Sequence, residues 1–338
     1  MFNKIIGHDF QKSLLLRAAK EGVVSHAYLF SGPDGVGKKL VAIEFAKLLN
    51  CNSDKRDLMT GECDCGSCRK VERGIHPDVV LVEYGGVNDI KVDQIREGIE
   101  DKLFLKPFEG AFKVVIVDES ERMNRSAQNA FLKTLEEPPP NSLIILLTSR
   151  STALLPTIRS RCQIVSFSPL PIEKIAQILE KETELSDSEV ELSSRLSEGS
   201  PGLALKFDKE LIDWRKDLLM RIAVLDYRSA SEIMELADTM PTESTPEDSQ
   251  KLKLVIEFIS LWLRDLIMIK IEADKKYLTH TDMIEESHRA AEGLSTDDIL
   301  RRQSSLQHTW NDIFYANANK RLSLENLFIQ LAMKTGAN

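Results

Sequence analysis

The segment AYLFSGPDGVGKK, from Ala27 to Lys39, decides the fold of this 338-residue chain. Its first part, Ala27 to Ser31, is a short apolar run that predicts a buried strand. Its second part, Gly32 to Lys39, is rich in glycine and leads directly into a segment with helical periodicity. A glycine-rich loop in this strand–loop–helix order is typical of a phosphate-binding loop.

Three glycines in this loop, followed by a lysine, form the expected phosphate site. The glycines would let backbone N–H groups turn toward a phosphate, and Lys38 would reach its outer oxygens. The motif normally continues with Ser or Thr, whose hydroxyl binds Mg²⁺, but this chain has Lys39. We therefore expect possible binding of ATP with impaired magnesium binding and doubtful hydrolysis; the alternative is a glycine-rich turn without a ligand. The glycines are Gly32, Gly35 and Gly37.

The rest of the first half repeats the alternation of apolar runs and amphipathic segments. Such β-branched runs are typical of buried parallel strands, and the amphipathic segments between them predict covering helices. The sequence therefore predicts an α/β fold with a mostly parallel sheet and helices on both faces. The further strands are expected at Asp78–Glu83, Lys113–Asp118, Ser142–Ser149 and Gln163–Phe167, and the helices at Lys39–Leu49, Asp93–Leu103 and Asn124–Glu136.

Helical periodicity replaces the strand pattern after Ser168–Pro171. Helices are expected at Ile172–Leu185 and Ser188–Leu196, and the Pro- and Ser-rich stretch Met240–Ser249 predicts a loop. Leu252–Ile271 has apolar residues at helical spacing, as expected of a long helix packed against its own domain or against a partner. These residues are Leu254, Phe258, Leu261, Trp262 and Leu266.

Two acidic residues follow the strand predicted at Lys113–Asp118. Asp118 and Glu119 stand at its carboxyl end, where a Walker B pair would hold Mg²⁺ and orient water. An acidic pair after an apolar strand can also cap a helix. The combination with the phosphate loop favours an ATPase module.

Four of the five cysteines lie between residues 51 and 68. Cys51, Cys63, Cys65 and Cys68 supply enough thiolates for a structural, tetrahedral Zn²⁺ site. Only one residue separates Cys63 from Cys65, so a reduced loop without metal is the alternative. His76 precedes Pro77 at a strand entrance and is expected to be structural.

Charge is unevenly distributed along the chain, whose formal net charge is −9. Through Ser166 there are 23 Lys and Arg with 22 Asp and Glu, and after it 21 with 31. This acidic second half favours protein contacts over extensive binding to nucleic-acid phosphates. No stretch is apolar and long enough to span a bilayer, and the first residues lack a signal-peptide core, so we expect a cytoplasmic protein.

Several segments together resemble bacterial sliding-clamp loader subunits, a family within the AAA+ ATPases. The resemblance covers nearly the whole chain, and Arg161 has the place of the family's Ser-Arg-Cys arginine. The segments that carry it are Asn129–Ser149, Ser160–Cys162, Gly199–Leu205, Trp262–Ile267 and Asn317–Phe328.

This resemblance implies three domains. Residues 1–167 would form an AAA+ phosphate-loop domain with a zinc-binding insertion at 51–68. Residues 168–207 would form a small helical lid, and residues 208–338 an all-helical collar that joins subunits. The implied partners are the other loader subunits in a hetero-oligomeric ring, with the sliding clamp and primed DNA reached through that complex.

The resemblance also implies roles for single residues. Arg161 would act as an arginine finger on the ATP of a neighbouring subunit, and Thr148 matches the strand-end residue that senses phosphate in active relatives. ATP-using members carry a lid arginine where this chain has Gly202. With Lys39, this indicates a subunit that serves its neighbours and has little or no ATPase of its own. The alternatives are a competent motor subunit of the gamma or tau type and a zinc-dependent DNA-binding module.

Overall fold

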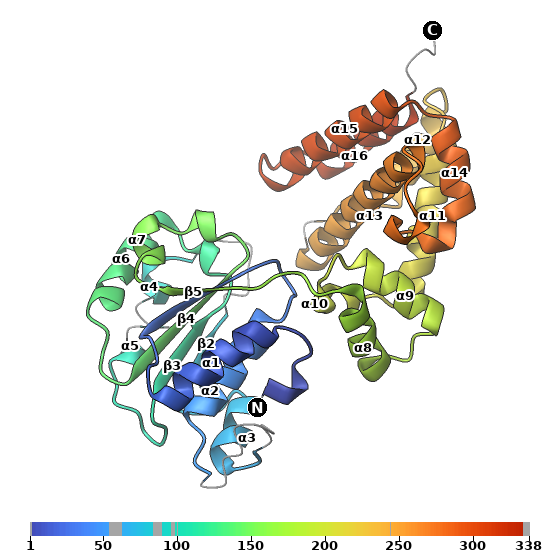
Figure 1. Ribbon diagram of the computed structural model, residues 1–338. Coiled ribbons are helices and arrows are strands. Elements are labelled where there is room, and N and C mark those ends of the chain that lie inside the picture. The colour runs from blue at the N-terminus through green and yellow to red at the C-terminus, as the bar shows by residue number, and fades with distance from the viewer. Residues whose placement is uncertain are drawn as a thin grey trace. The chain divides into compact units, whose positions relative to one another are not determined.

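The computed structural model describes residues 2–53, 63–83, 90–95, 99, 101–243 and 245–333. The chain forms two compact units, which we name the α/β unit and the helical unit (Figure 1). The α/β unit comprises Met1–Lys181 with Glu198–Leu203, and the helical unit Glu182–Ser197 with Ala204–Asn338. Residues of the expected lid occur in both units. The three-domain division remains a prediction.

The α/β unit is built on a five-stranded parallel sheet with the order β2-β3-β4-β1-β5 (Figure 1). Each strand coincides with an apolar run in the sequence, so the predicted α/β class is confirmed. The phosphate-loop strand β1 lies between β4 and β5, near the middle of the sheet. The strands are β1 (Ala27–Ser31), β2 (Val79–Val82), β3 (Lys113–Val117), β4 (Ser142–Thr148) and β5 (Gln163–Ser166).

Both faces of this sheet are covered, because successive strand side chains point to opposite faces. Tyr28 and Phe30 belong to the core beneath α1 and α2, and Leu29 belongs to the core beneath α6 and α7. Phe45 of α2 and Phe131 of α6 are fully buried in these two cores. The bounds are α1 (Asp9–Glu21), α2 (Lys38–Leu49), α6 (Arg125–Glu136) and α7 (Pro156–Arg159).

The helix expected at Asp93–Leu103 is helical wherever the structure describes it. The structure has α4 (Val92–Ile95) and α5 (Asp101–Leu103), and Ile99 between them also has helical backbone; residues 96–98 and 100 lie outside the described part. The unit also contains α3 (Gly66–Glu72) and α8 (Ile172–Glu182), the latter extending one residue past the boundary of the unit.

The helical unit is organised around the long helix α13, which contacts α11, α14 and α15. Three of the apolar residues of α13 are buried in this unit: Phe258, Trp262 and Leu266. They therefore pack in the core of their own unit, which was one of the two expected roles. Its helices are α9 (Asp187–Leu196), α11 (Lys209–Val224), α12 (Ala230–Asp238), α13 (Pro246–Lys270), α14 (Ile284–Glu292), α15 (Thr296–Phe314) and α16 (Lys320–Ala332). A further short helix, α10 (Pro201–Ala204), spans the boundary between the units.

The prediction of a loop at Met240–Ser249 is wrong for the second half of that stretch. Helix α13 begins at Pro246, and the Thr245 side chain accepts a hydrogen bond from the Asp248 N–H as its N-cap. Proline is compatible with the first turn of a helix, where its missing N–H leaves no bond unmade. The Pro- and Ser-rich composition therefore marked a helix start.

Among the described residues, the structure contains no helix long and apolar enough to cross a membrane.

Candidate phosphate-loop site and surface arginine

Three parallel strands bring the predicted site residues to one edge of the sheet. The phosphate loop follows β1, Asp118 follows β3, and Thr148 ends β4, and these strands are neighbours. The carboxyl ends of adjacent parallel strands are where open α/β sheets form their binding crevices. Here they surround a cavity of about 380 Å³, which Gly202 also lines.

The loop backbone requires its glycines. A Cβ atom at Gly32 would lie 2.2 Å from the carbonyl oxygen of Phe167, and Gly35 has a φ of +72°. Gly37, with a φ of 105°, is the N-cap of α2. These positions favour glycine because a side chain would clash or would adopt left-handed backbone. The sequence-based interpretation of these glycines as a tight loop agrees with this geometry.

The ammonium group of Lys38 is turned back onto its own loop. Its Nζ donates hydrogen bonds to the carbonyl oxygens of Gly32 (2.6 Å) and Pro33 (2.7 Å). The side chain is 8% exposed, and burial lowers the pKa of Lys38 against the opposing attraction of Asp34. A phosphate would have to replace both carbonyl contacts before it could use this cation.

Lys39 stands where the motif normally has a hydroxyl that binds magnesium. Its ammonium group lies beside Asp118, the first residue of the predicted acidic pair. Its Nζ is ion-paired with Glu83 and lies 3.4 Å from Asp118 Oδ2. Burial lowers the pKa of Lys39, but the contacts with Glu83 and Asp118 outweigh it and the pKa is raised. The carboxylate expected to hold Mg²⁺ is thus already neutralised by an ammonium group.

The other acidic groups of the cavity are also engaged. Glu119, with a φ of 47°, pairs through Oε2 with Arg122 Nη1 at 2.7 Å. Glu121 accepts hydrogen bonds through Oε1 from the Ser149 N–H at 3.0 Å and the Ser149 hydroxyl at 2.5 Å; burial raises the pKa of Glu121, but these bonds outweigh it and the pKa is lowered. Thr148 is buried, at 1% exposure. Its hydroxyl accepts a hydrogen bond from the Arg150 N–H at 3.1 Å.

Negative charge predominates among the side chains that line the cavity. Four carboxylates and two lysines line it. Burial raises the pKa of Asp34, and the nearby Glu121 and Glu119 raise it further while Lys38 lowers it. Anionic phosphates are stabilised by net positive surroundings, which this cavity lacks. The carboxylates are Asp34, Asp118, Glu119 and Glu121, and the lysines Lys38 and Lys39.

Gly202 packs directly on the phosphate loop. Its N–H donates to the Gly35 carbonyl at 2.9 Å, and a Cβ atom on Gly202 would lie 3.0 Å from Gly35 Cα. The Ser200 hydroxyl donates to the Asp34 carbonyl at 2.9 Å. A side chain at position 202 would press on Gly35, so the loop would have to shift by a few tenths of an ångström. Glycine at this position therefore allows the close approach of the two segments.

Sequence reasoning missed His8. Its Nε2 lies 2.7 Å from the Val36 carbonyl of the phosphate loop, and its ring packs edge-on against Phe167 at 5.0 Å. Burial lowers the pKa of His8, partly offset by the Val36 hydrogen bond, so a neutral ring donating from Nε2 fits this place. No periodicity or motif distinguishes such a histidine in one sequence.

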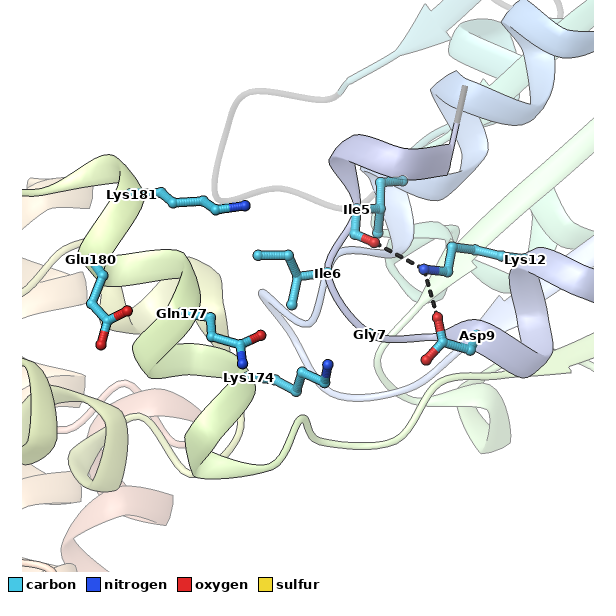
Figure 2. Close-up of a pocket in the computed structure, with 9 residues that line it drawn as sticks. All are labelled: Ile5, Ile6, Gly7, Asp9, Lys12, Lys174, Gln177, Glu180 and Lys181. Carbon is cyan, nitrogen blue, oxygen red and sulfur yellow. Dashed lines mark hydrogen bonds and ion pairs between the residues drawn. The ribbon is translucent and has the colours of Figure 1, made fainter. Parts of the chain in front are cut away.

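A second cavity of about 330 Å³ lies beside the start of α1. Figure 2 shows Lys174 and Lys181 of α8 on one side of it and Ile6 and Lys12 on the other. Lys12 donates to the Ile5 carbonyl at 2.9 Å and pairs with Asp9. Its amine is thus held within the chain.

Arg161 lies just after α7 and is not among the residues that line the phosphate-loop cavity. Its Nη2 pairs with Glu136 Oε1 at 2.6 Å, and its Nη1 donates to the Thr157 carbonyl at 3.0 Å. The side chain is 36% exposed and that of Glu136 50%. The guanidinium is therefore oriented but remains open to solvent, away from the chain's own loop.

The four clustered cysteines converge although residues 54–62 lie outside the described part. Their sulfur atoms all lie within 4.8 Å of one another, so they could hold a metal ion. Cys51 Sγ is 3.5 Å from Cys63 Sγ and 4.0 Å from Cys65 Sγ. Tetrahedral zinc, with Zn–S bonds of about 2.3 Å, separates its sulfurs by about 3.8 Å.

Hydrogen bonding in this cluster favours a thiolate. Burial raises the pKa of Cys65, but backbone hydrogen bonds from Cys68 and Asn52 outweigh it and bring the pKa to about 6. Burial and the neighbouring sulfurs raise the pKa of Cys68. His76 is not part of the cluster: its Nδ1 accepts from the Asp78 N–H and its Nε2 lies 3.0 Å from Ser67 Oγ. Its structural role is confirmed.

The sheet order and the loop that follows β1 define a P-loop module with a parallel sheet. Two family models match the chain: "DNA polymerase III, delta subunit" at residues 7–171 and "DNA polymerase III, delta subunit, C terminal" at residues 212–332. The delta′ subunit of Pseudomonas aeruginosa DNA polymerase III is 28% identical, with 97% of this chain and 98% of that protein covered. The Bacillus subtilis delta′ subunit is 27% identical, with 94% of each covered.

A tau subunit and a solved gamma-related protein are also similar to the chain. The tau subunit of Bacillus subtilis is 28% identical over 85% of this chain, which spans 54% of that protein. A solved gamma-subunit-related protein of Thermotoga maritima covers 95% of this chain and 98% of its own at 22% identity and a TM-score of 0.46. The chain belongs to the DNA polymerase III delta-subunit family, in which its full-length relatives are delta′ subunits.

Proposed function

We propose that the chain is the delta′-type subunit of a bacterial DNA polymerase III clamp loader, which lends Arg161 to the ATP site of a neighbouring subunit and hydrolyses no ATP itself. The observation that carries this proposal is an asymmetry within the α/β unit. Lys39 holds its cation against Asp118 in the chain's own site, whereas Arg161 presents its cation at an exposed edge.

Three features of the phosphate loop oppose hydrolysis by the chain itself. Lys38 is bonded to loop carbonyls, Lys39 neutralises Asp118, and Gly202 packs against the loop backbone. A competent motor needs a bound magnesium and a charge-stabilising arginine on the transferring phosphoryl group. These features favour the delta′ type over the gamma or tau type. They are compatible with weak nucleotide binding through Lys38 and the glycines, without Mg²⁺.

The chemistry of Arg161 suits a finger supplied in trans. A guanidinium is planar and always charged, so it can stabilise the spread charge of a phosphoryl group in transfer. Its present partners are a half-exposed carboxylate, Glu136, and the Thr157 carbonyl, and exposed ion pairs of this kind are worth little. A neighbour's phosphates can therefore replace Glu136 at small cost.

The proposed partners are the other loader subunits, joined through a collar at residues 208–338 in a hetero-oligomeric ring. The sliding clamp and primed DNA would be reached through that complex, in agreement with the acidic second half of the chain. Action in DNA replication places the protein in the cytoplasm. The lid at residues 168–207 belongs to the same proposal.

We further propose that Cys51, Cys63, Cys65 and Cys68 bind one structural Zn²⁺. The sulfur separations and the lowered pKa of Cys65 support this choice, since a closed set of four thiolates is typical of structural zinc. The ion would hold the end of α2 to the start of α3 and take no part in ATP chemistry.

The proposal is tested by assembling the loader with wild-type or Arg161→Ala subunit. Because an arginine finger in trans contributes roughly 10³ to 10⁵ in rate at its site, stimulated ATP turnover and clamp delivery onto primed DNA should fall, diluted by the other motor sites. Assembly, measured by size, should be equal. Arg161→Lys keeps the charge without the planar fork and should fail nearly as badly.

Arg125→Ala is the matched control, since Arg125 is an exposed arginine at the start of α6 in the same unit. It should leave turnover unchanged. Unchanged rates in a correctly assembled Arg161→Ala complex would make Arg161 a surface residue and remove the donor role.

A further inference from the structure

The helical unit contains a cavity of about 400 Å³ that the proposed function does not use. Its wall is formed by the end of α11, by α14 and the turn after it, and by single residues of α13, α15 and α16. Three arginines, Arg228, Arg289 and Arg302, line it together with one acidic residue, Asp226. We name this cavity the arginine pocket. Its lining carries an excess of positive charge within an otherwise acidic half of the chain.

Arg302 is the unusual member of the pocket, because it is buried and makes no direct ion pair among the described residues. It is 4% exposed, its Nε has no hydrogen-bond partner, and its Nη2 lies 3.4 Å from the Met333 carbonyl. Among the described residues, no carboxylate lies within ion-pair distance of it. Burial lowers the pKa of Arg302 to about 10, with Asp298 opposing and Arg301 adding to this shift.

The same unit treats another buried arginine differently. Arg215 is fully buried, but it is ion-paired with Asp282 and lies in the field of Asp265. A buried charge without a partner is costly, whereas a paired one is tolerated. Arg302 has only the more distant Asp298 on its own helix, so a carboxylate brought by a partner would supply the direct ion pair that the described residues do not.

The remaining lining fits an anionic group carried on an apolar segment. Arg289 is 73% exposed and only 3.9 Å from Glu286, and Arg228 donates from Nε to the Tyr227 hydroxyl at 3.0 Å. Neither contact consumes the whole guanidinium, which has five N–H donors. Val224, 80% exposed, together with Leu225 adds apolar surface beside these cations.

We propose that the arginine pocket binds the side-chain carboxylate of an acidic segment in a partner protein, with Arg302 as its buried anchor. Arginine forks match carboxylates in bidentate geometry, and desolvated arginines are frequent anchors of protein interfaces. A DNA phosphate is the less suitable anion, because the surrounding half of the chain has 31 Asp and Glu against 21 Lys and Arg. The proposal is independent of ATP chemistry and of Arg161.

The test uses the full chain and a fluorescent, end-blocked pentapeptide with a glutamate between leucine and phenylalanine. Fluorescence anisotropy should detect saturable binding, at least about tenfold weaker for the glutamine counterpart and for Arg302→Met, because each removes one half of a buried charged pair. Arg321→Met is the control, since Arg321 is exposed on α16 and paired with Asp238. It should bind as the wild type does.

A second measurement keeps the result independent of folding. Arg302→Met removes an unpaired buried charge, so its urea midpoint should be no lower than that of the wild type. Arg302→Lys, which keeps the charge but not the fork, should bind the peptide with intermediate affinity. The proposal is overturned if the wild type does not bind the peptide, or if Arg302→Met binds it equally well. It is also overturned if Arg302→Met is markedly destabilised. Tighter binding of oligothymidylate that depends on Arg302 would indicate a nucleic-acid site and would contradict the proposal as well.

Discussion

The phosphate-loop cavity and the Arg161 edge both present cations, but they use them in opposite ways. In the cavity, Lys38 is bonded to two backbone carbonyls and Lys39 is paired with two carboxylates. At the edge, Arg161 is held by one exposed carboxylate and one carbonyl and remains partly open to solvent. A cation satisfied inside its own site is not available for a ligand, whereas an oriented and exposed one is. This difference supports our proposal that the chain donates Arg161 to a neighbouring subunit and does not use its own phosphate loop for hydrolysis.

Removal of the proposed zinc is the largest perturbation we expect. Chelation should loosen the segment between Cys51 and Cys68 before the sheet unfolds, because the metal's binding energy contributes to local folding. Metal analysis should find about one zinc per chain. In an assembled loader, the contribution of Arg161 should survive, since the cysteine cluster and the arginine belong to different parts of the α/β unit.

Thiol alkylation checks this prediction and contains its own control. Cys162 is buried outside the cluster, and burial raises its pKa to about 12, so it should stay unreactive before and after chelation. Chelation should expose the four clustered thiols. Four freely alkylated thiols in protein that has never met a chelator would rule out the metal.

Replacement of Lys39 by threonine tests whether the chain's own phosphate loop can still support ATP hydrolysis. The new hydroxyl restores a magnesium ligand and frees Asp118, yet ATP turnover by the isolated chain should stay far below the enzyme median of about 10 per second. Gly202 supplies no lid arginine, and Lys38 keeps its carbonyl contacts. Lys39→Met removes the cation without adding a hydroxyl and serves as control. Metal-dependent ATP turnover near this median, in either the wild type or Lys39→Thr, would contradict the proposal that the chain's own site is inactive.

The smallest effect is expected for Glu136→Gln, which removes the ion pair between Glu136 and Arg161. The ion pair joins side chains that are 36% and 50% exposed, so its loss should change the free energy of unfolding by less than about 1 kcal/mol. Stimulated turnover of the loader should change less than with Arg161→Ala, because the guanidinium remains. Glu137→Gln, at an exposed neighbouring position, is the control. A Glu136→Gln defect as large as that of Arg161→Ala would mean that Glu136 itself is essential.

Local patterns in the sequence predicted the elements that depend on local forces. Every strand was found from its apolar run, and the phosphate loop from its glycine spacing. The error occurred where one residue type has two uses, as with Pro246 at a helix start. There, composition alone does not fix the backbone.

Side-chain directions depended on contacts between distant segments and were not predictable. The turn of Lys38 toward carbonyls, the hydrogen bond from His8 to Val36 and the packing of Gly202 on Gly35 arise only in the folded chain. The identities of Lys39 and Gly202 did signal a loss of function in advance. Their geometric link to the loop did not follow from the sequence.

The most direct test of this account compares two variants in the same assembled loader. Arg161→Ala removes the cation that we propose acts on a neighbouring subunit's ATP. Lys38→Ala removes the cation on which any nucleotide binding by the chain's own loop would depend. At equal assembly, we predict that Arg161→Ala lowers the DNA- and clamp-stimulated ATP turnover, whereas Lys38→Ala leaves it at the wild-type rate. A loss of turnover with Lys38→Ala, and none with Arg161→Ala, would contradict the account.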